Sequence, residues 1–276
     1  MTLLERNRFF KAGIILCAVI VLLILISSFI ILPFYSNMEE ASRRPAHIYQ
    51  AITGWFLNSN FYSVHITLVF AALFSLVAII LIHSFFERTH APEILYISIF
   101  TVSFTFESFR LFLPLHYIFN FPYIYLLIMS RFLLFIRYFS IFSLFTAGIC
   151  AAGLEVQKTR TIIFIITIAA LIITIGVPID ILNWDTSLNI VNGYRAIFRM
   201  IELAAFLTTT ISFFVAAKNR DTREYRYIAI GVILVFIGRN ILLGTDNWLG
   251  PVPGIALLSI GTWLICSKLH KIYLWL

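Results

Sequence analysis

Long apolar stretches separated by short polar segments cover almost the whole chain of 276 residues. A transmembrane α-helix needs about 20 consecutive, mostly apolar residues. Eight stretches satisfy this requirement, at residues 12–33, 62–85, 93–115, 123–150, 161–179, 194–216, 226–244 and 252–267. The pattern predicts an all-α integral membrane protein with eight transmembrane helices, one N-terminal helix followed by a seven-helix bundle. We expect a single polytopic membrane domain over residues 1–276, with the bundle at residues 62–267.

The connections between these stretches differ in length. The first connection, residues 34–61, is the longest, and Ile48, Ile52 and Phe56 recur within it at helical spacing after Pro45. This spacing predicts a short amphipathic helix lying on the outer membrane surface, with a plain connector as the alternative. Residues 180–192 form a second long outer loop, and residues 268–276 form a cytoplasmic tail.

Two local signals concern helix packing and helix ends. The run from Ala147 to Gly153 places small residues four positions apart on the fourth stretch, which permits close helix packing within the bundle. Pro178 lacks a backbone N–H and should end or kink the fifth stretch just before Asp180.

Composition supports a membrane protein and changes how the charge is interpreted. Hydrophobic residues make up 61% of the chain and charged residues 12%, whereas a typical soluble domain carries about 25% charged residues. The net charge of +7 would suggest a nucleic-acid partner in a soluble protein. In a multi-span protein it indicates the positive-inside rule, so membrane lipids are the expected partners and nucleic acid is not.

The basic residues of the connections predict an orientation. Most of them fall on the side of the N-terminus, among them Lys218, Arg220 and Arg223, while Arg43 and Arg44 fall on the opposite side. Cytoplasmic loops carry the excess of Lys and Arg. We therefore expect a multi-pass protein of the cell membrane, of the bacterial inner-membrane type, with both termini cytoplasmic.

Charged residues inside the predicted spans are the strongest functional signal. Such a residue at the bilayer centre costs about 2.5–3.5 kcal/mol on insertion scales, so it almost always faces a protein interior or a cavity. At about 1.5 Å per residue, all of these charged positions except the deeper Arg137 lie about 9–14 Å below the outer surface. The residues concerned are Arg110, Arg131, Arg137, Arg199 and Arg239, with Glu107 and Glu202.

Helix faces refine this set. Glu107 and Arg110 are three residues apart and share one helix face, whereas Arg131 and Arg137 are six apart and do not. We expect one of the two to point elsewhere, and Arg131 is the one assigned to the binding set. Two glutamates can neutralise two arginines, and the remaining guanidinium groups need backbone carbonyls, water or an anion.

These positions predict an outward-facing, arginine-rich intramembrane pocket. Guanidinium groups match carboxylate and phosphate oxygens geometrically, so the expected ligand is an anionic small molecule or a lipid headgroup. The alternative is a purely structural network of ion pairs. The predicted ligand-binding set is Arg110, Arg131, Arg199 and Arg239, oriented by Glu107 and Glu202 and bordered by Asn240, His65 and His116.

The leading hypothesis is a receptor-like, sensor-like or lipid-binding membrane protein that signals to a separate cytoplasmic protein partner. In span count alone the chain is similar to bacterial membrane sensor-input modules. An anion transporter or channel is an alternative, disfavoured because the inner halves of the spans are apolar apart from Arg137. A lipid-modifying enzyme is a further alternative, and it is disfavoured because the sequence contains no catalytic triad arrangement, glycine-rich phosphate loop or HExxH motif.

We expect no cofactor, no metal site and no disulfide framework, since Cys17, Cys150 and Cys266 stand in apolar stretches.

Overall fold

The computed structural model describes residues 3–42, 60–87, 89, 91–153, 159–184 and 187–274. Within these residues, eight helices are long and apolar enough to cross a membrane. The prediction of a helical, multi-pass membrane protein with eight spans is therefore confirmed at the level of helix length and composition.

The helices follow the predicted stretches closely. The spans are formed by α1 (Leu3–Ser42), α3 (Phe61–Phe86), α4 (Pro92–Phe106), α6 (Tyr123–Ala152), α7 (Thr159–Gly176), α8 (Arg195–Asn219), α9 (Glu224–Gly244) and α10 (Pro251–Leu274). A 3₁₀ helix, η1 (Glu107–Phe112), continues α4, and a short helix, α5 (Leu115–Phe119), precedes α6. An antiparallel hairpin of β1 (Ile179–Trp184) and β2 (Ile190–Asn192) joins α7 to α8.

The connections hold two departures from the predicted pattern. The first helix continues through Pro33 to Ser42, into the segment predicted to be an outer loop. The predicted interfacial helix around Ile48, Ile52 and Phe56 lies outside the described residues. The second predicted loop folds into the β-hairpin, in which Ile179 pairs with Asn192. As predicted, the fifth span ends before Pro178, since α7 stops at Gly176.

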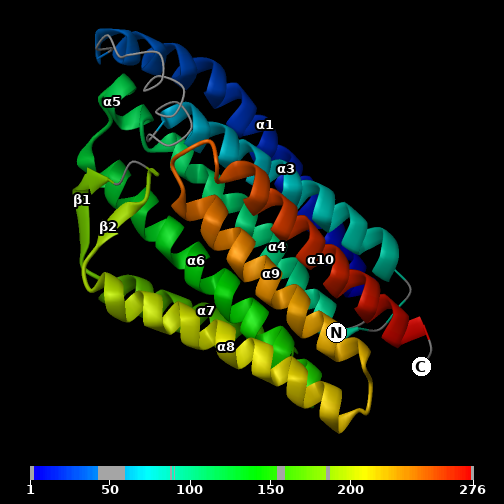
Figure 1. Cartoon of the computed structure of the whole chain (residues 1–276). Helices are drawn as coiled ribbons and strands as arrows, with labels where there is room; N and C mark the ends of the chain where they lie inside the picture. Colours follow the sequence, from blue (N-terminus) through cyan, green and yellow to red (C-terminus); the bar gives the residue numbers. More distant parts are fainter. Residues whose placement is uncertain are drawn as a thin grey trace.

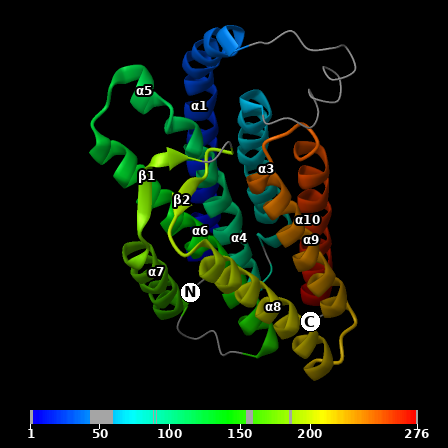
Figure 2. The same ribbon diagram turned by 60° about the vertical axis from the view of Figure 1, so that its left-hand side comes forward.

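Polarity decides which helix occupies the centre of the bundle. The span of α4 and η1 is the least hydrophobic of the eight, and 89% of the residues in its most apolar stretch are buried. The corresponding shares are 22% for α7 and 39% for α1, which is the most hydrophobic span. Figure 2 shows α4 surrounded by other helices, and α4 contacts α6, α3 and α1. A polar helix avoids lipid by taking the central position.

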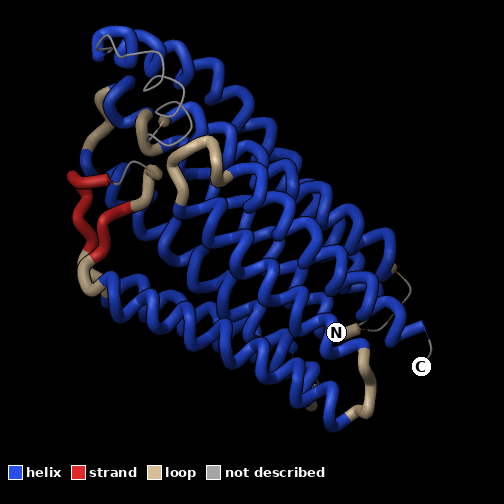
Figure 3. The backbone as a smooth tube through the Cα atoms, in the orientation of Figure 1, coloured by secondary structure: helices blue, strands red, loops and turns tan. Residues whose placement is uncertain are grey.

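The bundle has two distinct ends. Both termini of the described chain lie at one end, the terminal end, and the β-hairpin lies at the opposite end, the hairpin end (Figure 1). Figure 3 shows the two strands at the edge of the bundle at the hairpin end.

Close helix contacts rely on glycine at two places. A Cβ atom on Gly148 of α6 would lie 3.0 Å from the carbonyl oxygen of Thr209 on α8, so the predicted small-residue packing within the bundle is confirmed. A tighter contact joins α9 to α10, where a Cβ atom on Gly238 would lie 2.7 Å from the backbone nitrogen of Leu258. Glycine allows the two backbones to approach this closely.

Candidate functional site

A buried carboxylate collects arginines where α4 passes into η1. Glu107 is 1% exposed, and its Oε2 atom lies 2.6 Å from Nη2 of Arg110. Its Oε1 atom lies 3.3 Å from Nε of Arg137 on α6 and 3.6 Å from Nη2 of Arg239 on α9. Among the described residues these four side chains form one ionic group, named here the Glu107 cluster. It joins η1, α6 and α9 in the hairpin half of the bundle.

The cluster carries more positive than negative charge. Arg110 and Arg239 are buried, Arg137 is half-buried, and one carboxylate serves all three guanidinium groups. Glu202 on α8 is half-buried and attracts Arg137 electrostatically. An excess of cation in a low-dielectric interior is costly and favours any additional anion that can enter.

Arg239 has unused hydrogen-bonding capacity. Its Nε and Nη2 atoms are buried and make no hydrogen bond within the described part of the chain, although Nη2 contributes to the ion pair with Glu107. A cavity of about 10 Å³ lies beside this side chain, lined also by Phe206, Thr209 and Phe236. That volume holds about one water molecule. The guanidinium group of Arg239 can therefore donate to a further acceptor.

Residues 187–189, which precede β2, contact the cluster. The Oδ1 atom of Asn189 accepts a hydrogen bond of 2.8 Å from Nη2 of Arg137. The Nδ2 atom of Asn189 donates to the carbonyl oxygen of Leu243 at 3.0 Å and to Oγ of Ser187 at 2.8 Å. Ser187 and Leu188 are buried, and Leu188 has a φ of 54°, a left-handed conformation that is strained for this residue. Residues 187–189 are named here the cover loop.

Arginines of this region also satisfy helix ends. The last carbonyl groups of a helix have no partner within the helix, and in a membrane water cannot supply one. Nη1 of Arg110 donates to the carbonyl oxygen of Leu243 at 3.1 Å, near the end of α9. Arg131 donates to the carbonyl oxygens of Thr174, Ile175 and Val177 at the end of α7. Arg131 therefore serves a structural cap and lies outside the Glu107 cluster.

The structure brings together part of the predicted set. Glu107, Arg110 and Arg239 meet as their predicted depth implied. Of the two α6 arginines, Arg137 joins them and Arg131 does not, which reverses the expected assignment. The other predicted members lie apart: Arg199 on α8 and Asn240 on α9 are exposed. Arg110, Arg239 and Arg137 thus meet at the Glu107 carboxylate, and of these three Arg239 alone lines the small cavity.

The two predicted histidines have local partners. His65 on α3 is buried, and its Nε2 atom shares a hydrogen bond of 2.8 Å with Oγ of Ser28 on α1. His116 on α5 is buried against Tyr117 and Tyr123, with ring centroids 5.1 and 5.2 Å away. None of these partners of the two histidines belongs to the Glu107 cluster.

A second polar group at the terminal end was not predicted. Glu93, in the first turn of α4, is fully buried and accepts a hydrogen bond of 2.7 Å from the hydroxyl group of Tyr273 on α10. Arg220 lies 4.0 Å from Glu93 and donates to the hydroxyl oxygen of Tyr225 at 2.9 Å. Burial lowers the pKa of the Arg220 guanidinium, but Tyr225 and Glu93 outweigh burial and raise that pKa above its ordinary value.

The sequence offered little warning of these additional residues. Glu93 stands at the predicted boundary of the third span, where a charged residue is ordinary. Asn189 belongs to a polar loop, and its side chain acquires a role only through the fold of the hairpin. No family model, curated protein or solved structure matches this chain.

Proposed function

We propose that this protein is a receptor-like membrane protein that recognises an anionic group at the Glu107 cluster. In this proposal the first helix precedes a seven-helix bundle, both termini are cytoplasmic, and the protein resides in a cell membrane of the bacterial inner-membrane type. The hairpin end then faces outward. The observation that carries the proposal is Arg239, a buried guanidinium group with N–H groups that find no hydrogen-bond partner among the described residues. It lies beside a carboxylate already shared with two other arginines.

The expected ligand chemistry is that of a phosphate or carboxylate group. Arg137 already donates to a neutral oxygen, the side-chain carbonyl of Asn189. This bond is already charge-assisted by the guanidinium, and an anionic acceptor adds the Coulombic attraction between opposite charges. An anionic oxygen can therefore replace Asn189 on Arg137 with a net gain, and the same anion can accept from Arg239.

Displacement of the cover loop by the anion would change the hydrogen bonding at the end of α9. Asn189 and Arg110 both donate to the carbonyl oxygen of Leu243, close to the end of α9. When Asn189 leaves, the end of α9 loses one of these two donors. Because α9 packs tightly on α10, a shift of α9 reaches the terminal end, where a cytoplasmic partner can respond.

Phosphate binding tests the proposal directly. We expect inorganic phosphate to raise the Tm of the purified, detergent-solubilised protein. At a concentration of about 100 times Kd the stabilisation is about 2.7 kcal/mol. Arg239→Gln should lose this response, whereas Arg199→Gln removes an exposed arginine outside the cluster and should keep it. Equal stabilisation of both variants would show that phosphate binds elsewhere.

Two further experiments are needed. One distinguishes a lipid headgroup from free phosphate, and the other uses a variant that keeps every arginine and so controls for misfolding. A response to dioleoyl phosphatidate in phosphatidylcholine vesicles, without a response to inorganic phosphate, identifies a lipid headgroup as the ligand. Asn189→Ala leaves every arginine in place and removes the internal competitor, so it should bind the anion more tightly than the wild type. If neither probe stabilises the wild type or Asn189→Ala, the cluster is purely structural.

An anion transporter is the second candidate, and one observation favours it. The group around Glu93 lies 14 positions from Glu107 on the same helical segment, about 21 Å away. Charged residues therefore occur near both ends of α4. The hydroxyl groups of Ser98 and Thr101 between them donate to carbonyl oxygens of their own helix, which does not favour a polar path. Phosphate uptake into proteoliposomes that is lost in Glu93→Gln would support transport.

A further inference from the structure

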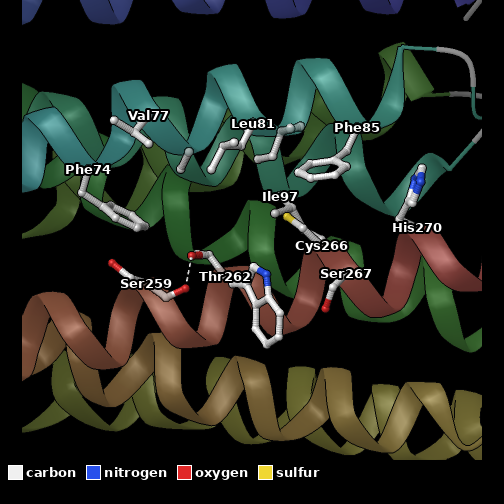
Figure 4. A pocket seen from close by; sticks show the side chains of 13 residues that line it. Phe74, Val77, Leu81, Phe85, Ile97, Ser259, Thr262, Cys266, Ser267 and His270 are labelled. Atoms are coloured by element: carbon white, nitrogen blue, oxygen red, sulfur yellow. Dashed lines mark hydrogen bonds between the residues drawn. The ribbon is translucent and has the colours of Figure 1, made fainter.

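An apolar groove separates α3 from α10 and is independent of the Glu107 cluster. It has a volume of about 460 Å³. The side chains of the two helices face each other across it, with Ile97 of α4 at its floor (Figure 4). Its extent on α3 is marked by Phe74 and Phe85, and on α10 by Ser259 and His270.

The groove runs along both helices. Its lining residues span 11 residue steps on α3 and 11 on α10, or about 16 Å at 1.5 Å per residue. A slim, extended chain can lie along a groove of this length.

The walls of the groove favour an apolar chain. Val77 and Trp263 are 55% and 68% exposed, so in a membrane the groove opens to the hydrocarbon region. The hydroxyl group of Thr262 donates to the carbonyl oxygens of Leu258 and Ser259 on its own helix. The hydroxyl group is thereby satisfied, and the surface offered to an occupant is mainly hydrocarbon and aromatic.

Polar groups gather at the terminal end of the groove. His270 packs between Phe85 and Phe86, with ring centroids 5.7 and 5.6 Å away, and its buried Nδ1 atom makes no hydrogen bond within the described residues. Ser267 lies one turn before it, whereas Lys268 and Lys271 face α9, over the ring of Tyr227 and in an ion pair with Glu224. A polar headgroup that can hydrogen-bond to Nδ1 of His270 is complementary to this end, where α3 also stops.

We propose that the groove between α3 and α10 binds one acyl chain of a membrane amphiphile, a fatty acid or a phospholipid, with its headgroup beside Ser267 and His270. An apolar groove with one polar end matches a molecule that has an apolar tail and a polar headgroup. The bilayer also supplies acyl chains to any groove that opens to its hydrocarbon region. This site shares no lining residue with the Glu107 cluster, so it holds whether or not that cluster binds an anion.

Photo-crosslinking tests the proposal with defined probes. The purified full-length protein is irradiated with palmitic acid that carries a diazirine in mid-chain, and in a second arm with a phosphatidylcholine that carries the same acyl chain. Adducts should map to α3 and α10 around Ala78 and Trp263, which line the groove. The probe that labels the groove at the lower concentration identifies the preferred occupant as a fatty acid or a phospholipid. Adducts spread evenly over lipid-facing helices, including α7, would overturn the proposal.

Substitutions that fill the groove supply the controls. Ala78→Trp on α3 and Ser259→Phe on α10 should each lower groove labelling about tenfold, equivalent to about 1.4 kcal/mol. Ile172→Trp adds the same bulk to an exposed position of α7 and should leave the labelling unchanged. The two filling variants lie on different helices, so a folding defect in one leaves the other decisive. Unchanged labelling in a folded filling variant contradicts the proposal.

Discussion

Glu107→Gln is the most informative single change because it removes the negative charge that three arginines share. The carboxylate is 1% exposed and lies 2.6, 3.3 and 3.6 Å from the nearest nitrogen atoms of Arg110, Arg137 and Arg239. Removing one partner of a buried ion pair typically costs 3–5 kcal/mol because the other charge stays behind unpaired. At about 2–4 °C per kcal/mol for chains of roughly this size, the expected fall in Tm is about 6–20 °C.

Buried thiol groups provide the assay. Cys17 and Cys150 are buried, whereas Cys266 is half-buried. In a Cys266→Ser background, a maleimide dye that fluoresces on reaction with thiols therefore reports unfolding as the temperature rises. Glu202→Gln is the matched control, since Glu202 is half-buried, attracts Arg137 electrostatically and forms no ion pair within the described residues. Its Tm should lie close to that of the wild type.

A double variant separates the effect of unpaired positive charge from the effect of changing the side chain's shape. Glu107→Gln with Arg239→Gln removes one of the cations that the first change leaves unpaired, so the double variant should melt above Glu107→Gln alone. The reasoning is refuted if Glu107→Gln melts within about 2 °C of the wild type, the shift expected for less than 1 kcal/mol. It is also refuted if the double variant melts lower than the single one.

The remaining predictions concern helix ends and helix contacts. Arg131→Met should speed hydrogen exchange at the end of α7, because lost donors to buried carbonyls cost about 1–3 kcal/mol; unchanged exchange there would contradict the cap. Gly238→Ala should destabilise the protein by about 1–3 kcal/mol through overpacking. A Cβ atom on Gly244 would meet no described atom within 4 Å, so Gly244→Ala should leave the stability unchanged. Equal melting temperatures of the two variants would count against the tight α9–α10 contact. Arg6→Ala should free the end of α3 for faster exchange, since Arg6 donates to the carbonyl oxygens there. Arg8→Ala, at an exposed position, should leave that exchange unaltered, and equal rates in both variants would exclude the cap.

The spans were predictable because the membrane selects for length and apolarity, which are properties of the sequence itself. The stretch 62–85 corresponds to a helix at Phe61–Phe86, and the stretch 226–244 to one at Glu224–Gly244. Helix ends outside the apolar region were not predictable in this way. Hydrogen bonding along the backbone continues past the last apolar residue, so α1 runs to Ser42 and α10 to Leu274.

The sequence predicted those site residues whose position depends on depth in the membrane alone. It did not predict those whose position depends on how a helix is rotated about its axis. Matching depth brought Glu107, Arg110 and Arg239 to one level, as the ion pairs show. Arg131 and Arg137 lie six positions apart on α6, so only one of them can face the cluster, and sequence spacing does not say which. The choice depends on the free carbonyl groups at the end of α7, which hold Arg131 and which no sequence pattern reveals.

The partners of each arginine separate structural roles from candidate binding roles. Arg131 directs its hydrogen bonds to backbone carbonyls, and Arg110 divides its own between Glu107 and a carbonyl. Arg239 has an ion pair but retains buried N–H groups without acceptors among the described residues. A buried donor without an acceptor costs about 1–3 kcal/mol, more when it is charged. A protein that keeps such a donor next to excess positive charge gains most from an acceptor that also brings negative charge. Recognition of an anion is therefore expected at Arg239, with Arg137 and the cover loop as the second contact, and not at Arg131.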